Sequence, residues 1–111
     1  DVIDLKNSLT IILGKDNRVF YHQKDEAQLN DKTLQETTFD SDGITKIIID
    51  AKENAPKKDN FTVIIAPTDD AVYKNFVDIL DEMAVTNSQR YGITEIRPWE
   101  LAVYKQKIGQ K

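Results

Sequence analysis

The sequence has no cysteine, a single histidine and few residues that break regular structure. Without thiols it forms neither disulfide bridges nor the thiolate sites that hold structural zinc. Four glycines and three prolines among 111 residues, with 40% hydrophobic residues, are typical of one folded domain rather than a disordered chain. No apolar run reaches the roughly 18 residues that a membrane-spanning helix needs, and no signal peptide is recognisable.

Positive charge is also scarce. The chain has 15 Lys and Arg against 19 Asp and Glu, which gives a formal charge of −4. The basic residues are scattered among carboxylates, whereas binding to a nucleic-acid backbone depends on clustered Lys and Arg. We therefore expect no nucleic-acid partner.

Patterns that carry catalysis or metal binding are missing as well. His22 is the lone histidine and no serine lies in a G-x-S-x-G pattern, so neither a catalytic triad nor a zinc site is predicted. Asp69 and Asp70 are interpreted as the acidic first turn of a helix, because carboxylates favour the positive end of the helix dipole. The four glycines lie too far apart for a phosphate-binding loop. We predict a protein that is not an enzyme and holds no cofactor.

Runs of β-branched and apolar residues predict four strands, at residues 8–14, 19–22, 61–66 and 91–97. The first two form a hairpin around a polar loop, in which Asp16 and Asn17 tolerate a left-handed backbone. Residues 61–66 end in four consecutive apolar residues, which is typical of a strand covered on both faces. Residues 23–38 are polar and are predicted to be a long connection, with a short extended piece near residues 37–39.

Two amphipathic helices are predicted from apolar residues at helical spacing. The first is capped by residues 40–43 and buries Ile44 and Ile48 on one face. The second begins with Thr68 as its cap and runs to Thr86. The tail at residues 99–111 has a weaker helical pattern.

The order of these elements predicts an α+β fold, with a mixed sheet of four to five strands and the two helices packed on one face. A right-handed crossover through the second helix makes the strands at residues 61–66 and 91–97 parallel. No second pair of helices is available for the opposite face of the sheet. That face must be polar, or be covered by the tail or by a second copy of the chain.

Three segments, taken in order, resemble the periplasmic domain of the ExbD/TolR family of biopolymer transport proteins. Residues 9–21 are similar to the family's opening hairpin. Residues 63–81 are similar to its strand, turn and helix, including Tyr73. Residues 91–96 are similar to its last strand. Thr68 stands where many members have Asp, and the tail beyond Pro98 lies outside the likeness.

This resemblance implies a non-enzymatic domain of a single-pass inner-membrane protein. Residues 1–7 would be a flexible segment that follows a membrane helix, residues 8–98 the periplasmic domain, and residues 99–111 a tail. Members form homodimers inside an ExbB- or TolQ-like proton channel. They transmit the energy of the proton gradient to TonB- or TolA-like proteins, and some members bind peptidoglycan. The resemblance does not distinguish an ExbD-like from a TolR-like role.

We expect partners to dock on the sheet edge, where unpaired backbone groups accept another strand. The residues predicted to bind partners are Ile3, Asp4, Leu5, Tyr91, Ile93 and Glu95. The alternative function is a small periplasmic ligand-binding module, which requires a pocket near Pro67, Thr68 and the end of the last strand.

Overall fold

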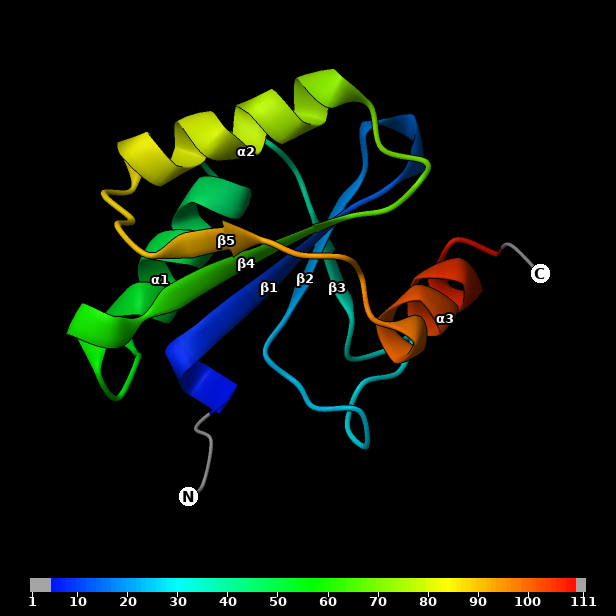
Figure 1. Ribbon diagram of the computed structural model, residues 1–111, viewed down its shortest axis with the longest axis horizontal. Helices are drawn as coiled ribbons and strands as arrows, with labels where there is room; N and C mark the ends of the chain where they lie inside the picture. Colours follow the sequence, from blue (N-terminus) through cyan, green and yellow to red (C-terminus); the bar gives the residue numbers. More distant parts are fainter. Residues whose placement is uncertain (1–4, 110–111) are drawn as a thin grey trace.

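A mixed five-stranded sheet forms the centre of the computed structural model, which describes residues 5–109. Three helices flank the sheet (Figure 1). The elements follow one another as β1 (Ser8–Leu13), β2 (Val19–His22), β3 (Gln35–Thr37), α1 (Ile44–Glu53), β4 (Thr62–Pro67), α2 (Tyr73–Val85), β5 (Tyr91–Ile93) and α3 (Pro98–Lys107).

The strands lie in the order β3-β2-β1-β4-β5. Strand β2 pairs antiparallel with both β1 and β3, whereas β4 pairs parallel with both β1 and β5. The prediction of an α+β fold with a mixed sheet is confirmed, as is the parallel pairing of the strands before and after α2. The hairpin loop between β1 and β2 turns through left-handed backbone at Asp16 (φ 56°) and Asn17 (φ 62°), the two residues predicted to tolerate that conformation.

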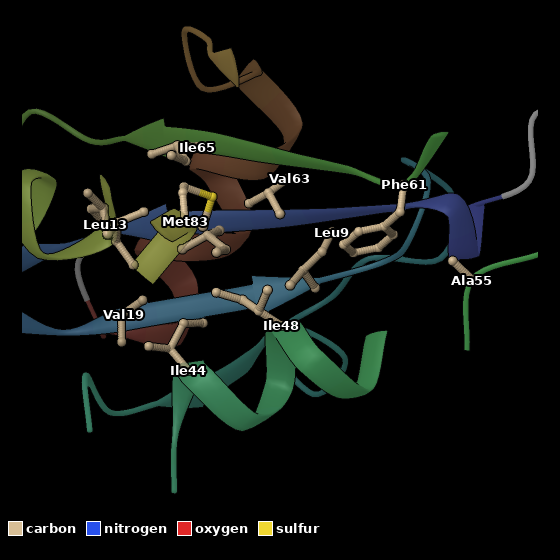
Figure 2. Packing of buried hydrophobic residues seen from close by; sticks show 12 residues of the cluster. Leu9, Leu13, Val19, Ile44, Ile48, Ala55, Phe61, Val63, Ile65 and Met83 are labelled. Atoms are coloured by element: carbon tan, nitrogen blue, oxygen red, sulfur yellow. The ribbon is translucent and has the colours of Figure 1, made fainter. Parts of the chain in front are cut away.

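Helices α1 and α2 cover one face of the sheet with a largely apolar layer. Figure 2 shows Ile44 and Ile48 of α1 pointing toward the strands, where they join Val63 and Ile65 of β4 in one cluster. All four side chains are fully buried. Burial of this layer supplies the hydrophobic free energy that holds the two helices on the sheet.

Both helices begin differently from the prediction. Helix α1 has Gly43 at its N-cap and no side-chain cap, so residues 40–42 do not cap it as expected. Helix α2 begins at Tyr73 rather than directly after Thr68. The Thr68 hydroxyl donates instead to the carbonyl of Leu13 (2.8 Å), which ties the end of β4 to β1 and leaves Thr68 outside the helix.

The tail forms a regular helix, α3, on the face of the sheet opposite α1 and α2 (Figure 1). Tyr104 of α3 is fully buried against Phe20, their rings meeting edge to face at 5.5 Å. A Cβ atom at Gly14 would lie 2.5 Å from the Tyr104 ring, so glycine is required for this approach. The second face is therefore covered in part by the tail, which is one of the possibilities that the sequence left open for it.

Strand β5 is shorter than predicted. It ends at Ile93, because Thr94 makes the last hydrogen bond to β4 and the chain then turns toward Pro98 and α3. Among residues 5–109, no helix is long and apolar enough to cross a membrane. The expected segment at residues 1–7 falls mostly outside the described residues, and Leu5–Asn7 form a short 3-10 turn before β1.

Candidate functional site

Within the part of the chain that the structure describes, the outer edge of β5 carries backbone groups without a neighbouring strand. The Val63 N–H donates to the carbonyl of Arg90 (3.0 Å), and the Thr94 N–H donates to the carbonyl of Ile65 (2.9 Å). Because successive residues of a strand direct their backbone groups to opposite sides, the N–H and C=O of Tyr91 and Ile93 point away from β4. This edge can accept another strand.

The side chains along this edge are apolar and exposed. Tyr91 is 47% exposed and Ile93 is 53% exposed, and both lie on the α2 side of the sheet beside Val63 and Ile65. Apart from its two chain neighbours, no atom of residues 5–109 lies within 4 Å of a Cβ atom added to Gly92. The edge is thus open both along its backbone and on the face that Gly92 presents.

The opposite edge of the sheet, β3, is polar. Its residues are Gln35, Glu36 and Thr37, and Glu36 receives two hydrogen bonds of 2.8 Å from the Arg18 guanidinium. These hydrogen bonds hold the pKa of the Glu36 carboxyl below its ordinary value. Charged side chains on an edge strand discourage pairing with another chain, so the two edges differ in their capacity to bind one.

The structure brings together only some of the residues predicted to bind partners. Tyr91 and Ile93 lie on the free edge, and Glu95 follows two residues later with an exposed side chain. Leu5 precedes β1, which is separated from β5 by β4, so Leu5 does not belong to the same edge. Ile3 and Asp4 lie outside the described residues.

A hollow of about 690 Å³ opens at the carboxyl ends of β4 and β5, the place where the ligand-binding alternative requires a pocket. The β4–α2 loop, the segment after β5 and helix α3 form its walls. Its lining residues are Pro67, Thr68, Asp69, Asp70, Glu95, Ile96, Arg97, Pro98, Leu101 and Lys105. The sequence analysis missed the contribution of α3, although Pro98, Leu101 and Lys105 recur at helical spacing.

A buried polar pair fixes α3 beside this hollow. His22 accepts a hydrogen bond at Nδ1 from the Lys24 N–H (3.0 Å), so its Nε2 carries the proton and donates to Glu100 Oε2 (2.8 Å). The other Glu100 oxygen accepts from the Arg97 N–H (3.1 Å). Burial favours the neutral form of Glu100, but these hydrogen bonds outweigh it and hold the pKa of the carboxyl below its ordinary value.

Both nitrogens of the His22 ring are thus hydrogen-bonded: Nδ1 to the chain just after β2, and Nε2 to Glu100, which holds β2 to α3. Glu100 was missed by the sequence analysis, although Pro98 followed by an acid two residues later is a recognisable helix start.

Comparison of the chain with protein-family models, with curated proteins and with solved structures finds no match.

Proposed function

We propose that this chain is a non-enzymatic protein-docking domain that pairs with a second copy of itself through the free edge of β5. The observation that supports this most directly is the combination of outward-pointing backbone groups and exposed apolar side chains at Tyr91 and Ile93. The polar β3 edge offers no comparable surface. Docking by strand addition obtains affinity from the backbone and specificity from alternate side chains.

The sequence of β5 favours an antiparallel pair related by a two-fold axis at Gly92. In that register Tyr91 of one copy lies opposite Ile93 of the other, and aromatic pairs with β-branched residues stabilise sheets. Arg90 lies opposite Thr94, so no like charges face each other. A two-fold interface of this kind is the commonest in homodimers.

We further propose the biological role that the resemblance implies. The domain would belong to an ExbD- or TolR-like subunit of an inner-membrane complex that uses the proton gradient for TonB- or Tol-dependent transport. An ExbB- or TolQ-like channel subunit and a TonB- or TolA-like protein would be its partners, with peptidoglycan as a further one. The support is the likeness of residues 9–21, 63–81 and 91–96, together with a mixed sheet in which those segments fall on β1–β2, β4–α2 and β5.

Cysteine cross-linking tests the dimer sharply, because the chain has no cysteine of its own. In the proposed register the two Gly92 Cα atoms lie about 4.5 Å apart, within reach of a disulfide. We expect Gly92→Cys to oxidise to a covalent dimer, and the matched variant Gln35→Cys on the β3 edge to remain monomeric. Equal cross-linking of both variants would contradict the proposal.

Sedimentation equilibrium of the unmodified chain provides a second test. We expect dimerisation to weaken at least tenfold in Ile93→Lys. Each copy would bury a charged lysine at the shared edge, and the two positive charges would repel each other. Gln35→Lys is the control and should leave the equilibrium unchanged. A chain that stays monomeric at all concentrations would refute the dimer.

The membrane role has a separate test. The coding sequence immediately upstream of Asp1 should encode an apolar helix that carries an acidic residue. A different upstream sequence would remove the proposed role while leaving the dimer to be judged on its own.

A further inference from the structure

We infer that the hollow at the carboxyl ends of β4 and β5 binds a small zwitterion of the amino-acid or short-peptide class. The ligand's ammonium group would lie beside Asp69 and Glu95, and its carboxylate beside Lys105. This site is separate from the free edge of β5 and does not depend on dimerisation.

The position of the hollow supports a ligand site. In open α/β sheets, ligands bind outside the carboxyl ends of parallel strands, and β4 and β5 are parallel with both carboxyl ends opening here. A volume of about 690 Å³ falls within the range of about 300–1,000 Å³ that small-molecule sites occupy. The hollow has room for a dipeptide as well as for a free amino acid.

Hydrogen bonds fix the walls of the hollow without using the charged side chains at its rim. The Tyr104 hydroxyl accepts from the Lys15 N–H (2.9 Å) and donates to Asp70 Oδ2 (3.0 Å), so α3 is tied to the β4–α2 loop. The Thr68 hydroxyl anchors the same loop to Leu13. Walls that are already ordered lose little conformational entropy when a ligand binds.

Charges of both signs line the hollow without neutralising one another. Within residues 5–109, Asp69, Glu95 and Lys105 form neither an ion pair nor a side-chain hydrogen bond. Arg97 also lines the hollow, and its guanidinium carbon lies 5.6 Å from the centre of the Trp99 ring. Carboxylates and an ammonium group that surround one hollow and remain unpaired are complementary to a molecule carrying both charges.

The apolar part of the lining indicates what else the ligand carries. Ile96, Leu101 and Pro67 line the hollow as well, and all three are half-buried. An aliphatic side chain on the ligand would cover these residues and remove apolar surface from water. L-Leucine and L-leucyl-L-leucine are therefore the probes that fit this lining.

Titration of the ¹⁵N-labelled chain with these probes, followed by amide chemical shifts, tests the inference. We expect saturable shifts at residues 67–70 and 95–105 with leucine or with the dipeptide. The probe that binds more tightly shows whether the natural ligand is a free amino acid or a short peptide. N-Acetyl-leucine, which lacks the ammonium group, and leucinamide, which lacks the carboxylate, should each bind at least tenfold more weakly. Shifts that do not saturate, or that are equal for the blocked compounds, would overturn the inference.

Matched variants separate the site from general charge effects. Lys105→Gln should weaken leucine binding about tenfold, because it removes one charge-assisted hydrogen bond to the carboxylate. Lys74→Gln removes the same charge from the outer side of α2, where Lys74 pairs with Asp78, and should leave binding unchanged. Asp69→Asn provides a second variant, on the β4–α2 loop, with the same expected loss. Equal effects of Lys105→Gln and Lys74→Gln would refute the site.

Discussion

The two faces of the sheet are held by different kinds of contact. On the face under α1 and α2, side chains such as Ile48 and Ile65 bury apolar surface and make no directional bonds. On the face under α3, an apolar cluster around Phe20 is joined by the His22–Glu100 pair and the Tyr104 hydroxyl. A broad aliphatic layer tolerates small shifts of a helix, whereas buried hydrogen bonds fix its position and orientation.

The largest effect is expected from the aliphatic face. Ile48→Ala should lower the free energy of unfolding by about 4 kcal/mol, because it leaves a cavity in a closely packed layer. Ile49→Ala, at the next position of α1, is the control, since Ile49 is 38% exposed. Its cost should stay below about 1 kcal/mol. Urea unfolding followed by circular dichroism measures both, and similar losses would break the distinction.

Removal of the carboxylate on the second face should cost nearly as much. Glu100→Ala is expected to lower the free energy of unfolding by about 3 kcal/mol, because the buried Nε2–H of His22 loses its charged acceptor and α3 loses a contact at its first turn. Glu95→Ala, an exposed acid outside the helix, should change stability by less than about 0.5 kcal/mol. The same urea experiment decides, and a neutral Glu100→Ala would show that the apolar cluster alone holds α3.

One polar residue sits within the aliphatic face and sharpens the contrast. Asn75 of α2 is 1% exposed, and within the described residues its side-chain oxygen accepts no hydrogen bond. Asn75→Leu keeps the branched shape and removes the unsatisfied acceptor, so we expect it to stabilise the protein by about 1 kcal/mol. A rise in thermal midpoint would confirm this, whereas a fall would indicate that the layer has no room for the added methyl groups.

The smallest effect is a dependence on acid confined to the second face. The pKa of Glu100 is lowered in the folded chain, so its contribution to stability is complete above the unfolded-state value, about 4.3, and is lost as the pH falls through the folded value. Stability measured by urea at successive pH values should therefore fall less steeply below about pH 4 in Glu100→Gln than in the unmodified chain. Parallel curves would assign the acid sensitivity to other carboxyl groups.

The elements of the aliphatic face were predictable because each carries its own periodic pattern. Ile44 and Ile48 recur at helical spacing, and the apolar run of β4 identifies a covered strand from the sequence alone. Tyr91 and Ile93 lie on the edge strand β5, although the sequence did not predict the order of the strands. The strand order that separates Leu5 from them depends on pairing between distant segments, which no local pattern encodes.

The second face was not predictable for the same reason. The bond between His22 and Glu100 joins residues 78 positions apart, and the position of Thr68 depends on a carbonyl 55 positions earlier. Helix α3 lacks a strong amphipathic pattern because part of its attachment is polar. Hydrophobic periodicity therefore showed that a helix was possible at residues 99–111 without showing where it docks.

The parallel pairing of β1 with β4 has a consequence for how the chain assembles. Ser8 pairs with Thr62 and Leu13 with Pro67, so the central strand acquires its second neighbour only after residues 62–67 have been synthesised. Until then the nascent β1–β2 hairpin exposes one side of β1 to other chains, and closing so large a loop is slow. The emerging protein is consequently most vulnerable to aggregation at this stage, and chaperone binding should concentrate on residues 8–13.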